Sequence, residues 1–230
     1  MTEAIVLSNS LGTTSRLWDR QLPALEPRFR VLRYEHRARP DVELLARDVI
    51  DLLDAEGIER AHFCGISLGG AVGMWLGANA AERVDRLVLA CTAARFPDPE
   101  RYRERAVLVH DEGTAPIVDA TLDRWFTPAF EDRALYRAML LAAPREAYAT
   151  CCEAVASWDF RDRLGEIAVP TLVIGGVEDP TVPPEDAERL AAAIPAARLA
   201  VLAGAAHLAN VEQAERFNEE LLAHLTGEET

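Results

Sequence analysis

The stretch Ala61-His62-Phe63-Cys64-Gly65-Ile66-Ser67-Leu68-Gly69-Gly70 decides how the rest of this chain is organised. An apolar run suited to a buried strand ends at Gly65, and a helical run begins at Ala71. Between them lies the pattern G-x-S-x-G, typical of a nucleophile elbow, a tight turn that holds its serine in a strained backbone conformation. Such a turn lifts the hydroxyl of Ser67 clear of the sheet, at the positive end of the following helix.

The same five residues also fit a simpler interpretation, a glycine-rich turn with an ordinary N-cap serine. The glycines favour the elbow, because a Cβ at Gly65 or Gly69 would collide with the neighbouring strand or helix. The strand before Ser67, the helix after it and the partners identified below favour catalysis.

Length and composition indicate one α/β domain with an inserted subdomain. The chain has 230 residues, of which 50% are hydrophobic, so it can bury a large core. No apolar run is long enough to cross a bilayer, and we expect no signal peptide. The four cysteines (Cys64, Cys91, Cys151, Cys152) have neither metal-ligand spacing nor the density of a secreted disulfide framework. We therefore expect a cytoplasmic protein with no membrane partner and no metal.

The charge excludes several functions. The formal net charge is −14, so nucleic acid, which needs a basic face, is not an expected partner. All 24 basic residues are arginine and none is lysine, which excludes Schiff-base chemistry and a P-loop lysine.

Strand-like and helix-like segments alternate along the chain. Strands are predicted at residues 5–7, 31–34, 61–65, 87–91, 171–175 and 198–202. Helices are predicted at residues 15–26, after the N-cap Asp41 to about residue 56, after the elbow, and at 211–225. This alternation favours a mainly parallel sheet covered by helices on both faces.

One region interrupts the alternation. Between residues 97 and 165 the strand pattern disappears, and several helices are broken by Pro116, Pro128 and Pro144. We interpret residues 97–165 as a helical cap over the carboxyl edge of the sheet. Residues 1–96 and 166–230 then form the α/β core.

A serine hydroxyl is a weak nucleophile until a base removes its proton. His207 is the predicted base, because it directly follows the last predicted strand and so lies at the same edge as Ser67. His36 also ends a strand at that edge and is a candidate pocket residue. His62 is expected to pack inside the fold, and His110 and His224 are expected to be solvated.

The base in turn needs an acid to hold its tautomer and to stabilise its charged form. Asp179 follows the next-to-last predicted strand and reaches the same edge; the adjacent Glu178 is its rival. A turn residue before proline is the ordinary role for Asp179. The chain order Ser67, Asp179, His207 is nevertheless that of the α/β-hydrolase fold, and it favours a triad.

The developing negative charge on the substrate oxygen requires two backbone N–H groups. Leu68, the residue after the nucleophile, supplies one of them. Leu11, in the loop after the first predicted strand, is the best candidate for the other.

With these residues in place, the chain resembles the α/β-hydrolase superfamily over nearly its whole length. More narrowly, it resembles the 3-oxoadipate enol-lactonases of the β-ketoadipate pathway. The segments that carry this resemblance are Leu7-Ser8-Asn9-Ser10-Leu11-Gly12-Thr13, Phe29-Arg30-Val31-Leu32-Arg33-Tyr34, Ala61-His62-Phe63-Cys64-Gly65 and Arg124-Trp125-Phe126-Thr127-Pro128.

The resemblance implies a serine hydrolase that opens the ring ester of an enol-lactone without a metal or cofactor. It implies that Trp125 contacts the substrate beneath the cap; a cap-core aromatic is the alternative. Because the substrate carries a carboxylate, Arg124 and Arg133 are candidate partners for it, although either arginine could simply be solvated. The expected partner is a small lactone or ester, and the sequence leaves a homo-oligomer open.

Two departures from the family pattern bear on substrate choice. The strand hairpin that normally precedes the Leu7 region is missing from this sequence, and the loop after Tyr34 is short. Without the hairpin, the strand containing Val31 is expected at a sheet edge. Three alternatives therefore stay open: a carboxylesterase or other lactonase, a lyase that uses the triad as a base, and a ligand-binding module without turnover.

Overall fold

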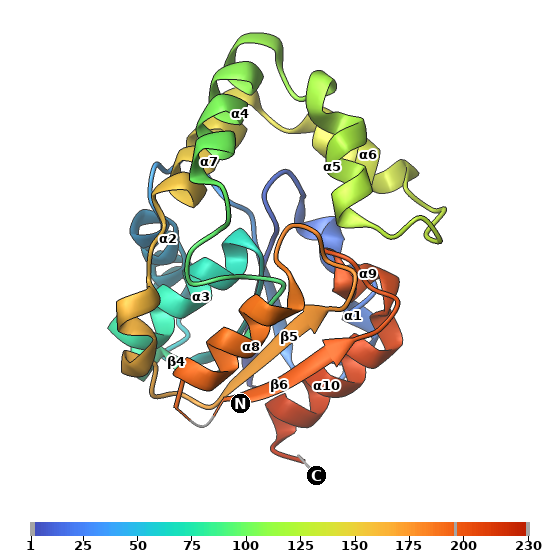
Figure 1. Cartoon of the computed structure of the whole chain (residues 1–230). Helices are drawn as coiled ribbons and strands as arrows, with labels where there is room; N and C mark the ends of the chain where they lie inside the picture. The colour runs from blue at the N-terminus through green and yellow to red at the C-terminus, as the bar shows by residue number, and fades with distance from the viewer. Residues whose placement is uncertain (1–2, 196, 229–230) are drawn as a thin grey trace.

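The computed structural model describes residues 3–195 and 197–228, and the centre of this part is a parallel sheet in the order β2-β1-β3-β4-β5-β6 (Figure 1). Its strands are β1 (Ala4–Ser8), β2 (Arg30–Tyr34), β3 (Ala61–Ile66), β4 (Val84–Ala90), β5 (Thr171–Gly176) and β6 (Arg198–Leu202). Every neighbouring pair is parallel, which confirms the predicted sheet. All carboxyl ends therefore meet at one edge.

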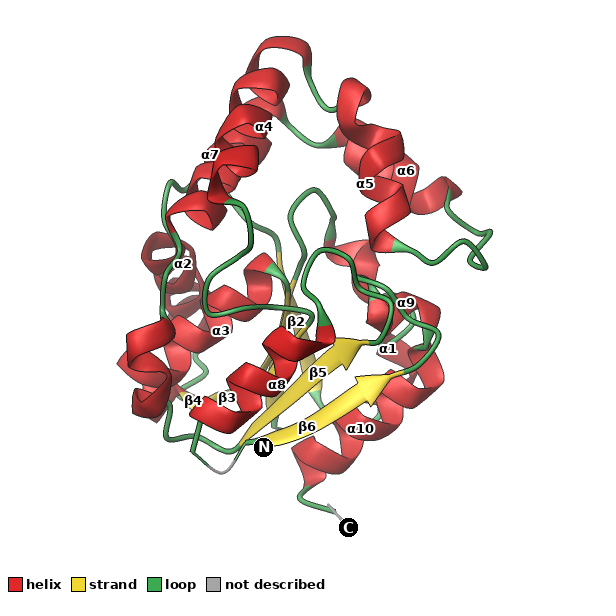
Figure 2. Cartoon of the chain, viewed as in Figure 1, coloured by secondary structure: helices red, strands yellow, loops and turns green. Residues whose placement is uncertain are grey.

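Helices cover both faces of this sheet (Figure 2). Those of the core are α1 (Leu22–Leu25), α2 (Val42–Ala55), α3 (Leu68–Asn79), α8 (Pro184–Ala193), α9 (Ala209–Glu212) and α10 (Ala214–Thr226). Short 3₁₀ helices lie before α1 (η1, Ser15–Trp18), between α3 and β4 (η2, Ala81–Arg83) and before β5 (η4, Arg161–Glu166). The predicted N-cap Asp41 accepts a hydrogen bond from the Leu44 N–H at 2.8 Å and so starts α2.

Between β4 and β5 the described chain is helical, as predicted. This segment contains α4 (Pro99–Glu112), η3 (Ala115–Ile117), α5 (Val118–Trp125), α6 (Ala134–Ala142) and α7 (Arg145–Ser157), and we call it the cap. Pro116 lies in η3, Pro128 lies between α5 and α6, and Pro144 is the N-cap of α7. In Figure 1 the four α-helices of the cap lie beyond the carboxyl ends of the strands. The division at residues 97 and 165 stays a prediction.

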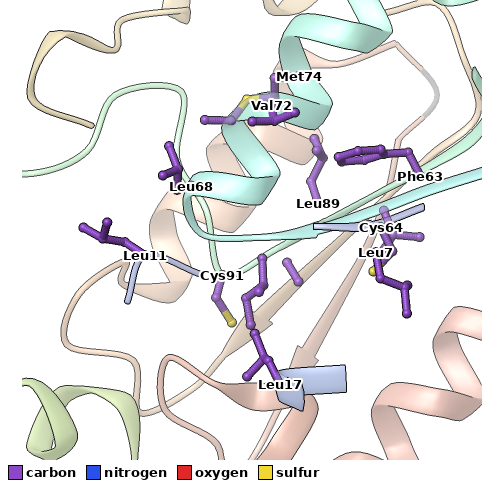
Figure 3. Packing of buried hydrophobic residues seen from close by; sticks show 14 of the residues in the cluster. Leu7, Leu11, Leu17, Phe63, Cys64, Leu68, Val72, Met74, Leu89 and Cys91 are labelled. Atoms are coloured by element: carbon purple, nitrogen blue, oxygen red, sulfur yellow. The ribbon is translucent and has the colours of Figure 1, made fainter. Parts of the chain in front are cut away.

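Helix α3 packs closely against the central strands β3 and β4. Gly73 of α3 allows this approach, because a Cβ there would stand 3.0 Å from a Phe63 ring carbon and 3.1 Å from a Leu89 methyl carbon. Figure 3 shows Phe63 and Leu89 in this layer, with Met74 of α3 above them. These side chains are buried, so the elbow at the start of α3 rests on a rigid base.

Two details of the sequence prediction are wrong. Residues 15–26 form η1 and then α1, because Pro23 lacks an N–H and its ring would clash inside a continuous helix. His224 is buried rather than solvated, since it shares one face of α10 with Phe217, Leu221 and Leu225. As expected, β2 lies at an edge of the described sheet.

Candidate active site

Ser67 sits in a strained turn between β3 and α3. Its φ is +57°, a value that side-chain-bearing residues rarely adopt. Two hydrogen bonds fix this turn: the Ser67 N–H donates to the Ala90 carbonyl at 2.9 Å, and the Thr92 hydroxyl donates to the Ser67 carbonyl at 2.8 Å. Both partners lie at the end of β4, so this neighbouring strand holds the strained turn in place.

The glycines on either side are required by close backbone contacts, as the sequence predicts. A Cβ on Gly65 would stand 2.1 Å from the Gly69 carbonyl oxygen, and one on Gly69 would stand 2.3 Å from the Ser8 carbonyl oxygen. No larger residue fits at either position unless the backbone moves.

Asp179 and His207 are brought together from the ends of β5 and β6. The His207 Nδ1 lies 2.8 Å from Asp179 Oδ2, and both side chains are buried. The other oxygen of Asp179 accepts hydrogen bonds from the Thr181 N–H at 2.8 Å and the Val182 N–H at 3.0 Å. The carboxylate is thus held in place, and its bond to Nδ1 leaves the Nε2 of His207 as the other nitrogen of the ring.

Glu178, the rival acid, points its carboxylate elsewhere. Its two oxygens accept the Gly204 N–H at 3.2 Å and the Ala205 N–H at 3.1 Å. Glu178 therefore holds the loop that leads to His207, whereas Asp179 contacts the imidazole itself.

One oxyanion candidate lines the same pocket as Ser67, and the other follows Ser67 directly in the chain. Leu11 lines that pocket, and Leu68 begins α3, where the first N–H groups of a helix have no intrahelical partner. Within the described residues, neither backbone N–H donates to a protein acceptor. The loop that carries Leu11 is fixed, because the Asn9 carbonyl accepts the Gly69 N–H at 3.1 Å and the Asn9 side chain accepts the Trp18 indole N–H at 3.1 Å.

This pocket lies between the sheet edge and the cap. Its floor comes from the elbow and the neighbouring loops: Ser10, Leu11, Ser67, Thr181 and His207. Its roof comes from the cap: Arg101, Tyr102, Arg105, Thr121, Arg124, Trp125, Tyr148 and Val155.

The structure separates the two predicted substrate arginines. Arg124 and Trp125 both line the roof, whereas Arg133 lies outside the pocket. The Arg133 guanidinium pairs with Asp123 at 3.0 Å and donates to the Thr127 carbonyl at 2.7 Å. The expectation that Arg133 meets the substrate is therefore corrected, because its donors hold the loop after α5.

The sequence analysis did not identify the other roof residues. Arg101 and Arg105 lie on α4, Thr121 on α5 and Tyr148 on α7. Polar residues occur on all sides of α4, so its sequence alone does not say which of them face the pocket.

Glu212 is a further residue that the sequence analysis missed. One oxygen accepts the N–H of Thr127 at 2.9 Å and its hydroxyl at 2.8 Å, and the other accepts the Ala206 N–H at 2.7 Å. The Leu208 N–H also donates to the Trp125 carbonyl at 3.0 Å. The loop that carries His207 is thus bonded directly to the cap.

His36 lies beside the pocket rather than in it. Its Nε2 is 3.1 Å from the Ser8 hydroxyl, and burial lowers its pKa to about 4. It lines a neighbouring cavity that shares Ser10, Leu11 and Tyr148 with the active-site pocket. His62 is buried against the Phe29 ring, as expected for a packing residue.

Two further properties of the described residues concern metal ions and membranes. No group of three or more His, Cys, Asp or Glu side chains in residues 3–195 and 197–228 could hold a metal ion. Over the same residues, no helix is both long and apolar enough to span a membrane. All four cysteines are free and buried.

A buried Asp–His pair, a strained serine in the same pocket and two free backbone N–H groups are the parts needed for acyl transfer. The comparisons with known proteins agree with this chemistry. The model of the alpha/beta hydrolase family matches residues 5–220.

Individual relatives match over nearly the whole chain. A 3-oxoadipate enol-lactonase of Acinetobacter baylyi is 37% identical over 227 residues, which cover 93% of this chain and 85% of that protein. A protein of Stutzerimonas stutzeri named for carbamate hydrolysis (RutD) is 34% identical over 96% of this chain and 91% of its own length.

Among solved structures, an enol-lactonase from Burkholderia xenovorans LB400 is 40% identical, with a TM-score of 0.95. The match covers 98% of this chain and 92% of that one. The predicted fold and the predicted hydrolase class are confirmed: the chain belongs to the α/β-hydrolase family.

Proposed function

We propose that this protein hydrolyses the ring ester of 3-oxoadipate enol-lactone, or of a closely similar carboxylated enol-lactone, and releases 3-oxoadipate. The observation that carries the proposal is the 2.8 Å contact between Asp179 and His207, because His207 lines the same pocket as Ser67. The choice of substrate is supported by 37% and 40% identity to two proteins named as enol-lactonases.

In this mechanism the Ser67 hydroxyl attacks the lactone carbonyl while the Nε2 of His207 accepts its proton. The bond from Nδ1 to Asp179 stabilises the imidazolium that forms. The N–H groups of Leu11 and Leu68 stabilise the tetrahedral oxyanion, and losing one such donor typically costs about 10² to 10³ in rate.

Collapse of the tetrahedral intermediate opens the ring. As the bond between the carbonyl carbon and the ring oxygen breaks, the ring oxygen takes the proton from the His207 imidazolium and leaves as an enol, which tautomerises to a ketone. The acyl group stays bonded to Ser67, and His207 is neutral again. Water, activated by His207, then attacks this acyl-enzyme and releases a dicarboxylate.

A second candidate is hydrolysis of a carbamate. The 34% identical relative named for carbamate hydrolysis favours it, and the same triad would serve it. The two candidates differ in the substrate's charge, because an enol-lactone of the proposed kind carries a carboxylate whereas a simple carbamate ester does not.

The test is the loss of 3-oxoadipate enol-lactone absorbance with purified protein, beside Ser67→Ala and a neutral 4-nitrophenyl ester. We expect rapid lactone turnover that falls by about 10⁴-fold or more in Ser67→Ala, with the circular dichroism spectrum unchanged. Ester cleavage without lactone turnover would keep the triad and discard the lactone. Comparable lactone turnover in Ser67→Ala would overturn the nucleophile assignment, and binding without any turnover would support a ligand-binding module.

A further inference from the structure

The roof of the pocket is cationic in a strongly acidic protein. The chain has 38 acidic and 24 basic residues, yet no Asp or Glu lines this pocket, and Arg101, Arg105 and Arg124 do. Most arginines of the described chain pair with carboxylates; these three form no such ion pair within residues 3–195 and 197–228. Burial also lowers the pKa of Arg124 below its usual value.

Arg105 is held in one position by neutral aromatic side chains. Its guanidinium donates to the Tyr148 hydroxyl at 3.4 Å and lies 5.7 Å from the centre of the Tyr102 ring. Tyr148 packs in turn against Gly12, where a Cβ would stand 2.7 Å from a Tyr148 ring carbon. Because a guanidinium has five N–H donors, Arg105 keeps donors free for a ligand.

The Thr121 hydroxyl independently indicates that a ligand binds in this part of the pocket. Its side chain is only 3% exposed, lines the pocket, and has a hydroxyl oxygen without any hydrogen-bond partner among the described residues. A buried hydroxyl without a partner is costly, by roughly 1–3 kcal/mol. Thr121 precedes Arg124 and Trp125 by three and four residues on α5, so the three share one face of the helix.

We propose that Arg105 and Thr121, with Arg124 beside them, form a carboxylate subsite in the roof of the pocket. The subsite selects substrates whose acyl chain ends in a carboxylate and holds that end while the ester carbonyl lies over Ser67. This inference rests on the proposed ester hydrolysis and adds the residues that decide the substrate's charge.

A carboxylate fits this set of donors. Guanidinium and hydroxyl groups both donate to carboxylate oxygens, and hydrogen bonds to a charged group are stronger than neutral ones. Each such bond contributes about 1.5–3 kcal/mol, which corresponds to about 10- to 100-fold in affinity. The ligand would also give the Thr121 hydroxyl its missing partner.

The first experiment compares two esters of the same chain length, 4-nitrophenyl hydrogen adipate and neutral 4-nitrophenyl hexanoate. The adipoyl chain has the six carbons of the acyl group that the proposed lactone would leave on Ser67. We expect the wild type to show a kcat/KM ratio of about 10 or more in favour of the charged ester. A ratio of one or below would overturn the subsite.

Single substitutions then test which residues produce this kcat/KM ratio. Arg105→Gln and Thr121→Val should each lower it about tenfold, and Thr121→Ser, which keeps the hydroxyl, should restore it. The matched control is Arg103→Gln on the same helix, because Arg103 is exposed and pairs with Glu100 at 3.0 Å. The proposal would be contradicted if Arg105→Gln and Thr121→Val left the kcat/KM ratio unchanged. It would also be contradicted if Arg103→Gln lowered the ratio equally.

A binding measurement separates this proposal from the proposed function. Titrating adipate into Ser67→Ala by calorimetry needs no turnover. We expect binding that weakens at least about tenfold when Arg105→Gln is added and stays unchanged when Arg103→Gln is added. Equal adipate binding by all three proteins would overturn the subsite even if ester hydrolysis through Ser67 holds. Binding with the expected pattern would keep the subsite even if no ester were cleaved.

Discussion

The floor and the roof of the pocket satisfy their polar groups in opposite ways. On the floor, Asp179 is bonded to His207 and to two backbone N–H groups. On the roof, Arg124 has no carboxylate partner and the Thr121 hydroxyl has no hydrogen-bond partner among the described residues. Polar groups whose hydrogen bonds are made within the protein keep their geometry whichever substrate binds. Polar groups that lack a partner gain one only from a substrate that carries a suitable acceptor. In the proposed mechanism the floor therefore carries out the reaction, and in the proposed subsite the roof selects the substrate.

The largest effect that this comparison predicts is on the floor. Asp179→Asn should lower kcat by about 10⁴-fold, because the amide leaves His207 in the wrong tautomer for accepting the serine proton. The charged and neutral esters should lose rate equally. Stopped-flow or steady-state assays of both esters measure this, with Glu178→Gln in the same loop as the control, for which we expect a loss below about tenfold. An unequal loss between the two esters would show that floor and roof do not act separately.

The next effect concerns the backbone of the floor. Gly69→Ala would place a Cβ 2.3 Å from the Ser8 carbonyl oxygen and so push α3 away from the loop after β1. We expect a destabilisation of about 1–3 kcal/mol, or roughly 2–10 °C in Tm, with loss of activity on both esters. Gly165→Ala is the control, because nothing lies within 4 Å of a Cβ there. Equal melting temperatures of the two variants by calorimetry would refute the close contact at the elbow.

A smaller effect is expected on the apolar part of the roof. Trp125 is buried and lines the pocket, so Trp125→Phe should raise KM about three- to tenfold through lost apolar contact. The rise should be similar for both esters, since the indole carries no charge. Steady-state kinetics with the two esters measure it. An unchanged KM for both would place Trp125 in the cap core only, and a change confined to the charged ester would move Trp125 into the carboxylate subsite.

The smallest predicted effect lies beside the pocket, at His36. Burial lowers its pKa to about 4, whereas the unfolded chain has the ordinary value of 6.5. Between these values the unfolded state binds more protons, so the contribution of His36 to stability is complete above pH 6.5 and is lost as the pH falls toward 4. The slope is at most about 1.4 kcal/mol per pH unit.

Urea unfolding at pH 7 and pH 5 tests this prediction. His36→Gln should lose less stability between the two pH values than the wild type does. His110→Gln, on the exposed face of α4, serves as the control and should follow the wild type. A His36→Gln protein with the full pH dependence would show that another group is responsible.

The sequence predicted best those segments whose residue pattern allows few backbone conformations. An apolar strand before G-x-S-x-G and a helix after it leave few conformations for Ser67, and the positive φ of that residue agrees. The prediction failed at residues 15–26, because Pro23 prevents one continuous helix there. It also failed at His224, because the burial of this residue depends on which face of α10 packs against the core. Its catalytic roles for Ser67, Asp179 and His207 stay predictions until activity is measured.

The sequence by itself determined the sheet edge and the order of the residues that meet there. In a parallel sheet every strand ends at the same edge, so residues that follow β3, β5 and β6 converge however far apart they lie in the chain. Only the tertiary structure decided which cap residues join them. Arg101, Arg103 and Arg105 look equivalent in the sequence, yet Arg105 lines the pocket and Arg103 is exposed, because the packing of α4 against α7 sets the rotation of the helix. No local pattern encodes that rotation, since it depends on contacts between segments that are distant in the sequence.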